Sequence, residues 1–161
     1  MTQTIYLAGG CFWGVEAYFK NIDGIIDTEV GYANGLTEET SYNDLKRTDH
    51  AETVEVKFDE NKISLEKILD YLFYIIDPYS VNRQGNDIGR QYRTGIYSKD
   101  PEILKEVEAY VENKQKETDK QIQVEVENLK NFIIAEEYHQ DYLDKNPTGY
   151  CHVNLNDIPQ L

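Results

Sequence analysis

The stretch 52–77, ETVEVKFDENKISLEKILDYLFYIID, changes its hydrophobic period from that of a strand to that of a helix. Residues 52–60 alternate apolar and polar side chains, which is typical of a half-buried strand. Residues 64–77 carry an apolar stripe at helical spacing, and Pro78 ends this helix. The strand's apolar face is made of Val54, Val56 and Phe58. This pairing predicts a sheet with helices packed against it.

The rest of the chain continues this mixture of strands and helices. Several of the strands alternate polar and apolar residues, so we expect one sheet face to be covered more fully than the other. The predicted fold class is α+β: a two-layer sandwich with a mixed or antiparallel sheet, helices mainly on one face, a ferredoxin-like core and long irregular segments. Further strands are expected at 4–8, 25–35, 94–98 and 121–129, and further helices at 11–20, 41–47, 101–117 and 135–146.

The length and composition favour one globular domain over residues 1–161. Hydrophobic residues make up 40% and charged residues 29%, which argues against disorder. No apolar run approaches the roughly 20 residues that a membrane helix needs. The first residues, MTQTIYLAGG, lack the basic start and apolar stretch of a signal peptide, so we expect a cytoplasmic protein.

The net charge of −14, from 30 acidic and 16 basic residues, restricts the partners of the protein. An acidic surface repels phosphate backbones and anionic lipids, so neither nucleic acid nor membrane is an expected partner. Solubility is the simplest explanation of the charge. The acidic surface also favours a monomer over an oligomer.

The stretch 7–19, LAGGCFWGVEAYF, places Cys11 at a turn between a strand and a helix. There the positive end of the helix would favour a thiolate over a thiol. Gly9, Gly10 and Gly14 permit close approach of backbone N–H groups to the sulfur. The neighbouring aromatic rings of Phe12 and Trp13 suggest that the thiol faces a small, apolar ligand. A buried, inert cysteine is the alternative.

The second cysteine, Cys151, lies near the end of the chain in a segment with turn residues. A reducing compartment argues against a permanent bridge to Cys11. The two cysteines and three histidines are a poor set of candidate zinc ligands, because no CxxC or HxxxH spacing occurs. We therefore expect no bound metal. A mobile tail cysteine can reach another sulfur, although it can also be incidental.

Four polar positions outside the cysteine turn are further candidates. The segment 78–95 is long, irregular and rich in arginine and glutamine, and such segments are usually functional or disordered. It contains Asp87 and Tyr92, while Tyr42 lies in the polar stretch TSYND and Glu52 just before the strand. Taken singly, each has a simpler explanation: packing for the tyrosines, solvated charge for Glu52 and turn formation for Asp87.

Five blocks of sequence together resemble the peptide methionine sulfoxide reductase A family. They occur in the family's order within residues 7–154. Small departures occur at Asn34, at Asp49, where glycine is usual, and at Thr94, where serine is common. The blocks are GGCFWGVE (9–16), SYNDLKRTDHAETVEV (41–56), QGNDIGRQYRTGIY (84–97), EEYHQDYL (136–143) and NPTGYCHVN (146–154).

The resemblance implies reduction of methionine S-sulfoxide, free or in proteins, with antioxidant repair as its role. Cys11 would be the nucleophile and Glu52 the acid that protonates the sulfoxide oxygen, which requires a carboxyl buried in low dielectric. Tyr42 and Tyr92 would hydrogen-bond to the same oxygen or steady the transition state, and Asp87 would hold the surrounding network.

The resemblance also implies how the substrate is enclosed and the enzyme recycled. Phe12 and Trp13 would surround the substrate's ε-methyl group. Cys11 would become a sulfenic acid, which Cys151 would convert to an internal disulfide. Thioredoxin or a similar dithiol would then reduce the disulfide, and no metal, flavin or nucleotide would be needed.

Two rival readings predict different behaviour. A hydrolase or acyltransferase would pair Cys11 with His50 or His139 and would be indifferent to Cys151. A non-catalytic acidic binding domain would have structural, unreactive cysteines.

Overall fold

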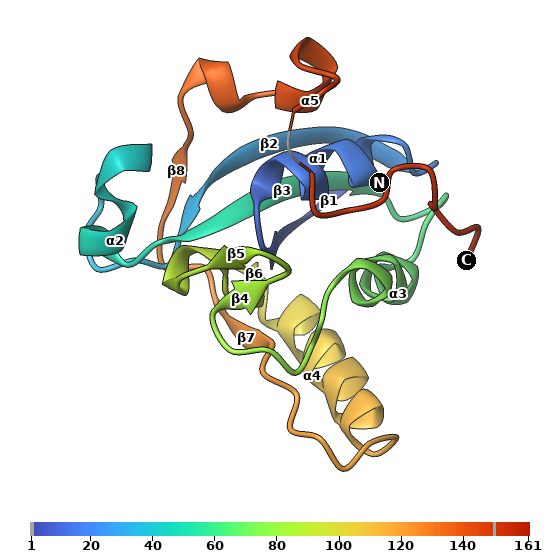
Figure 1. Ribbon diagram of the computed structural model, residues 1–161. Helices are drawn as coiled ribbons and strands as arrows, with labels where there is room; N and C mark the ends of the chain where they lie inside the picture. The colour runs from blue at the N-terminus through green and yellow to red at the C-terminus, as the bar shows by residue number, and fades with distance from the viewer. Residues whose placement is uncertain (1, 150) are drawn as a thin grey trace.

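The computed structural model describes residues 2–149 and 151–161, and its centre is a six-stranded mixed sheet (Figure 1). The strand order is β7-β6-β1-β3-β2-β8, in which β6 and β7 are parallel and the other neighbours antiparallel. Because β1 and β3 are central, the residues at their ends lie in the middle of the molecule. The six strands are β1 (Thr2–Gly9), β2 (Ile25–Ala33), β3 (Ala51–Asp59), β6 (Thr94–Ser98), β7 (Glu125–Asn128) and β8 (Phe132–Ile134).

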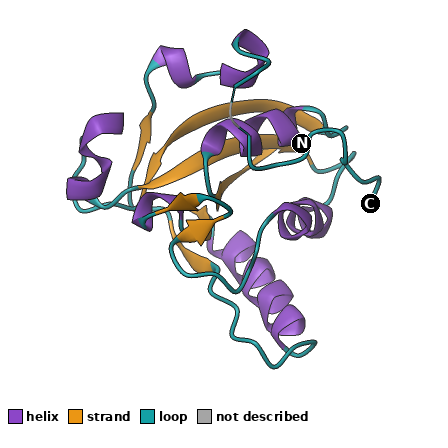
Figure 2. Ribbon diagram, viewed as in Figure 1, coloured by secondary structure: helices purple, strands orange, loops and turns teal. Residues whose placement is uncertain are grey.

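The longer helices contact this curved sheet, whereas the short helical segments lie at its margins (Figure 2). The α-helices are α1 (Phe12–Lys20), α2 (Leu45–Thr48), α3 (Leu65–Ile75), α4 (Pro101–Gln115) and α5 (Tyr142–Lys145), and the 3-10 turns are η1 (Tyr42–Asp44), η2 (Arg90–Tyr92) and η3 (Glu137–His139). The side chain of Ser64 caps α3 by accepting a hydrogen bond from the Lys67 N–H. Pro101 opens α4 after its cap, Asp100.

The core confirms the patterns of the strand 52–60 and the helix 64–77. Val54, Val56 and Phe58 are buried in the same cluster as Ile68 and Leu72 of α3. That cluster also takes in side chains from α1 and α4. The opposite face of the sheet carries a smaller cluster of Ala8, Ala33, Ala51, Tyr97 and Leu129.

The predicted helix at 135–146 is wrong. The segment forms η3 and α5, separated by Asp141 in the left-handed region at φ 53°. The Gln140 side chain bonds to both backbone groups of Val30, and Glu16 accepts the N–H of Asp141. Glu16 thus satisfies an N–H that a continuous helix would bond internally, and the Gln140 side chain ties the segment to β2. Strand β8 was not expected, and the strand predicted at 121–129 is confined to Glu125–Asn128.

The irregular segment 78–95 is folded on itself. Strands β4 (Arg83–Gln84) and β5 (Asp87–Ile88) form a small antiparallel hairpin that leads into η2. The Gln84 side chain is buried and bonds to both backbone groups of Asp77 and to the Ser80 hydroxyl. These bonds fix the hairpin beside the end of α3, so Asp87 and Tyr92 occupy defined positions.

The segment 151–161 packs against the molecule, unlike the flexible tail expected from its composition. Val153 is buried in the main core, and a ring nitrogen of His152 is 2.9 Å from the Gly9 carbonyl oxygen. The Tyr74 hydroxyl donates to Asp157. The residue Cys151 is therefore held near the turn that carries Cys11. In the described part of the chain, no helix is long and apolar enough to cross a bilayer.

Candidate active site

Cys11 is the N-cap residue of α1, directly after the end of β1. Gly10 has φ 88°, which glycine adopts without strain, and a Cβ there would lie 2.7 Å from Cβ of Gln84. The turn therefore needs glycine for both its shape and its close packing. The side chain of Cys11 makes no capping hydrogen bond, but the backbone N–H groups of Trp13 and Gly14 are near enough to the sulfur to lower the pKa of the thiol.

The sequence suggested a thiolate at Cys11, but the structure favours the protonated thiol. The residue is only 6% exposed, and burial raises the pKa of its thiol well above the usual range. The negative charge of Glu52 raises the pKa further, while the two N–H groups of the helix end lower it. Desolvation outweighs the helix end, so the expected thiolate is not the resting form of Cys11.

Glu52 lies on β3 with its carboxylate against the same helix start. Its side chain is buried and accepts the Phe12 N–H at 3.1 Å. Burial raises the pKa of Glu52 to about 8, the Phe12 N–H lowers it, and the charge of Asp87 raises it. The carboxyl is thus mostly protonated at neutral pH and lies close enough to Cys11 to act on its charge.

Tyr42, Tyr92 and Asp87 come together around this pair from two separate segments, because Asp87 and Tyr92 both belong to the segment 78–95. Tyr42 begins η1, Tyr92 ends η2, and their side chains are hydrogen-bonded to each other. Burial raises the pKa of both phenols, and the charges of Glu52, Asp87 and Cys11 raise it further. Both hydroxyls therefore stay protonated and can donate hydrogen bonds.

Phe12 and Trp13 form an aromatic cluster at the start of α1. The Trp13 ring stacks on Tyr142 with centroids 3.8 Å apart and planes 10° apart. The Phe12 ring lies 5.6 Å from Tyr32 and 5.3 Å from His139. Phe12 is fully buried, whereas Trp13 is partly exposed. The cluster provides an apolar wall beside the thiol.

Cys151 lies against the same first turn of α1. A Cβ at Gly14 would be 3.0 Å from the Cys151 sulfur, and the N–H of Gly14 is near enough to the Cys11 sulfur to lower the pKa of that thiol. Both sulfurs thus border one glycine, and both cysteines are free. The Cys151 thiol donates to the Val153 carbonyl at 3.0 Å, and burial raises its pKa.

Sequence reasoning assigned no role to Glu136 or Tyr142, which also belong to this region. Glu136 accepts hydrogen bonds from the Tyr32 hydroxyl at 2.7 Å and from the Tyr42 N–H at 3.1 Å. Burial raises the pKa of Glu136, but these donors outweigh it, so the pKa falls below its usual value. The block EEYHQDYL contains both residues, and its resemblance to the family was the sequence signal for them.

The two histidines of the rival hydrolase reading are engaged elsewhere. His50 is fully buried, and its Nδ1 is 2.9 Å from the Thr48 hydroxyl. The His139 Nδ1 accepts a hydrogen bond from the Trp13 indole at 3.0 Å. These contacts disfavour a Cys–His pair at Cys11.

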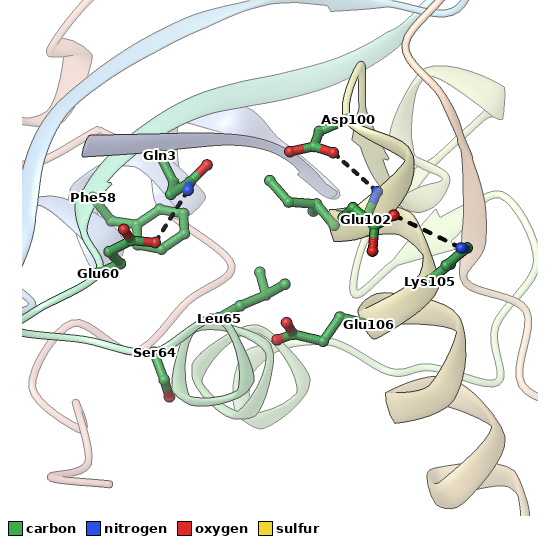
Figure 3. Close-up of a pocket in the computed structure, with 10 residues that line it drawn as sticks. Gln3, Phe58, Glu60, Ser64, Leu65, Asp100, Glu102, Lys105 and Glu106 are labelled. Carbon is green, nitrogen blue, oxygen red and sulfur yellow. Dashed lines mark hydrogen bonds and ion pairs between the residues drawn. The ribbon is translucent and has the colours of Figure 1, made fainter. Parts of the chain in front are cut away.

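A groove of about 640 Å³ lies between the starts of α3 and α4 (Figure 3). Glu60, Asp100, Glu102 and Glu106 are among its lining residues, and the candidate residues described above are not. Within residues 2–149 and 151–161, no cluster of three or more His, Cys, Asp or Glu is arranged to hold a metal ion.

Comparison with known proteins gives consistent matches. The family model for peptide methionine sulfoxide reductase matches residues 3–160. Reduced Mxr1 of Saccharomyces cerevisiae is 42% identical with a TM-score of 0.86, over 93% of this chain and 88% of that chain. Methionine sulfoxide reductase A of Corynebacterium diphtheriae is 35% identical with a TM-score of 0.87, over 93% and 77%.

The structure of Mxr1 in complex with Trx2 also matches, at 33% identity and a TM-score of 0.63, over 88% of this chain and 84% of that chain. The family match covers nearly the whole sequence, and the thiol, carboxyl and aromatic side chains expected from the motifs lie together in the fold. The chain therefore belongs to the peptide methionine sulfoxide reductase family.

Proposed function

We propose that Cys11 reduces methionine S-sulfoxide and that Glu52 donates the proton that the sulfoxide oxygen needs. The observation that carries this proposal is a buried thiol beside a buried carboxyl whose pKa is raised to about 8. Two electrons pass from the Cys11 sulfur to the substrate sulfur, and the oxygen moves to Cys11. The thiol becomes a sulfenic acid, and methionine is released.

The raised pKa of the Cys11 thiol is compatible with this chemistry. A sulfoxide sulfur carries partial positive charge, so a bound substrate favours the thiolate next to it. Protonation of Glu52 removes the negative charge that opposes the thiolate. Activation of Cys11 therefore depends on substrate, and the free enzyme keeps a protected thiol.

Tyr42 and Tyr92 hydrogen-bond to the sulfoxide oxygen as negative charge develops on it. Their paired, protonated phenols support this role. Asp87 helps to keep Glu52 protonated, because its charge raises the Glu52 pKa. Phe12 and Trp13 enclose the ε-methyl group, a role supported by their rings at the start of α1.

Cys151 resolves the sulfenic acid. Its thiol attacks the sulfur of Cys11, water leaves, and a disulfide joins the two residues. The position of both sulfurs beside Gly14 supports this step. A thioredoxin or another dithiol then reduces the disulfide. The Mxr1–Trx2 complex supports thioredoxin as the reductant here.

The finer architecture belongs to this proposal as well. We infer a ferredoxin-like core, which the element order β1-α1-β2-β3-α3-β6 and the spatial order β6-β1-β3-β2 support. We also infer two layers, one of the sheet and one of helices. The main hydrophobic cluster, which includes side chains of α1, α3 and α4 on one sheet face, supports this arrangement. A single domain over 1–161, a cytoplasmic location with two free thiols and a monomeric state complete the proposal.

One experiment tests the cycle. The reduced protein receives one equivalent of methionine S-sulfoxide without reductant, and the protein mass and the free methionine are measured. We expect one methionine per protein and a mass loss of about 2 Da as the disulfide forms. Cys151→Ser should instead gain about 16 Da as the sulfenic acid. Methionine formation by Cys11→Ser would refute the proposal.

A further inference from the structure

The Trp13 indole is held by two different contacts from one segment. It stacks on Tyr142, and its Nε1–H donates to the Nδ1 atom of His139 at 3.0 Å. A stacked ring fixes the plane of its partner but leaves rotation within that plane free. The hydrogen bond removes this remaining freedom, because it fixes the direction of one N–H bond.

His139 itself has little room to move. It is 2% exposed, and its ring lies 5.3 Å from Phe12, 4.7 Å from Tyr42 and 4.3 Å from Tyr138, between ring centroids. An acceptor Nδ1 carries no proton, so the neutral ring bears its proton on Nε2. Burial lowers the His139 pKa, which favours this neutral form, although the charge of Glu136 opposes the shift.

The segment that carries His139 is tied to α1 and β2. Glu16 of α1 is buried, accepts the Asp141 N–H at 2.8 Å and accepts the Thr28 hydroxyl at 3.0 Å. The neighbouring Gln140 bonds to both backbone groups of Val30. His139 is therefore fixed relative to the helix that begins at Cys11, and this makes it a suitable anchor for Trp13.

We propose that His139 is a positioning residue that orients the Trp13 indole and thereby sets which alkyl group on the substrate sulfur the site admits. The inference rests on the proposed role of Trp13 as a wall around the methyl group. His139 acts through Trp13 and takes no part in the oxygen transfer. Removal of the acceptor should loosen the wall, weaken substrate binding and relax selection for methyl over ethyl.

The test compares His139→Phe, which keeps a ring but has no acceptor, with His139→Asn, whose amide oxygen lies near the place of Nδ1. Tyr110→Phe is the matched control, because it also leaves an aromatic ring without its polar group but lies on α4, where its hydroxyl bonds to Asp70. The measurements are kcat and KM for the S-sulfoxides of methionine and ethionine. Trp13 is the only tryptophan, so fluorescence reports its environment directly.

For His139→Phe we expect KM for the methyl substrate to rise about tenfold, which corresponds to one lost hydrogen bond, with kcat changed less than about twofold. The preference for methyl over ethyl should fall several-fold, and the Trp13 emission should shift. His139→Asn should restore most of the KM and of the preference. Tyr110→Phe should resemble the wild type in all measurements.

Unchanged KM and unchanged preference in folded His139→Phe would overturn the proposal. A loss confined to kcat would also overturn it, because it would place His139 in the chemical step. Trp13→Phe separates a failure of the proposed role of Trp13 from a failure of the proposed role of His139. If Trp13→Phe leaves the preference for methyl over ethyl intact, the proposed role of Trp13 fails. If Trp13→Phe relaxes the preference and His139→Phe does not, only the present inference fails.

A measurement on the wild type makes the test independent of whether the variants fold. Nitrogen NMR of the imidazole distinguishes a protonated from an unprotonated Nδ1. We expect the proton of His139 on Nε2 and the indole N–H of Trp13 protected from exchange. A proton on Nδ1 at neutral pH would exclude the hydrogen bond from Trp13 and with it the proposal.

Discussion

At the scale of single residues, burial governs the ionisation of Cys11 and Glu52, and the charge of Glu52 also acts on Cys11. Each is buried, and burial disfavours the charged form of both groups. A thiolate and a carboxylate so close together would repel one another, so the resting site holds two protons. In the proposed reaction the sulfoxide oxygen takes the proton of Glu52, and the thiol proton of Cys11 then restores the protonated carboxyl.

The first prediction concerns Glu52→Gln. The wild-type rate of methionine formation in a single turnover should fall as the pH rises through about 8, because Glu52 then loses its proton. Glutamine cannot supply a proton, so the variant should be slower by a factor on the order of 10² or more and should lack this alkaline limb.

The matched control is Glu55→Gln on the same strand. Glu55 lies on the other face of β3 and accepts a hydrogen bond from Tyr6, far from the thiol. The pH dependence of methionine formation by Glu55→Gln should match that of the wild type. An alkaline limb that persists in Glu52→Gln would assign that limb to another group.

The second prediction concerns Asp49, which stands where glycine is usual in the family. Its φ is 62°, so the backbone keeps the left-handed conformation, which aspartate tolerates better than most residues. Its carboxylate also pairs with Arg90. Asp49→Gly should be more stable than Asp49→Ala by about 1 kcal/mol, because alanine strains this backbone. Denaturant unfolding of both variants checks the difference, and an equally stable alanine variant would contradict it.

At the scale of elements, the start of α1 serves both cysteines. Its N–H groups contact the Cys11 sulfur, and its Gly14 leaves space for Cys151 and Val153. Glycine inside a helix usually costs about 1 kcal/mol relative to alanine. Close contact with the segment 151–161 explains why the helix accepts this cost.

The third prediction follows from that contact. Gly14→Ala would place a Cβ 3.0 Å from the Cys151 sulfur and 3.2 Å from Cγ2 of Val153, so the segment must shift. Methionine should still form in the first step, while disulfide formation slows by roughly tenfold or more because the attack geometry is disturbed. Rapid-quench mass spectrometry separates the steps. Disulfide formation at the wild-type rate would show that Cys151 does not act from this position.

The segment 135–146 shows where prediction of an element failed. Its polar and apolar pattern suits a helix, but Glu16 of α1 accepts the Asp141 N–H, and the Gln140 side chain bonds to the backbone of Val30 on β2. No local pattern reveals a side chain that reaches the segment from a residue more than 100 positions away. Strand β3 and helix α3 were predicted well because their own periodicity determines which face is buried.

At the scale of the whole molecule, the enzyme class expected from the motifs is confirmed. The family match and the two solved relatives support a thiol-dependent methionine sulfoxide reductase. Cys11 directly follows the central strand β1, and the acidic side chains are exposed or half-buried apart from Glu16 and Glu52. The net charge of −14 also means that the folded state carries substantial self-repulsion at neutral pH.

The fourth prediction concerns stability against pH. Burial raises the pKa of Glu52 to about 8 and of Glu16 to about 7, so the folded state binds more protons than the unfolded state between about pH 4.5 and 8. The stabilisation from these protonated groups is complete below about pH 4.5 and is lost as the pH rises through their folded values. The melting temperature should therefore fall between pH 5.5 and 8.5.

The double variant Glu16→Gln/Glu52→Gln tests the cause of this fall. Neutral amides do not titrate, so its melting temperature should depend less on pH over the same range. Thermal unfolding at constant ionic strength, with wild type and variant side by side, provides the measurement. Parallel curves for the two proteins would show that general charge repulsion dominates instead.

The sequence by itself determined the family, the central strand and helix and the set of chemical groups, because these depend on local periodicity and on short motifs. Tertiary structure decided what those groups do. Burial is a property of the packed molecule, and it made Cys11 a protonated thiol in spite of the helix end beside it. Packing also brought His139 to Trp13 and Cys151 to Gly14 from opposite ends of the chain, which no spacing along the sequence encodes.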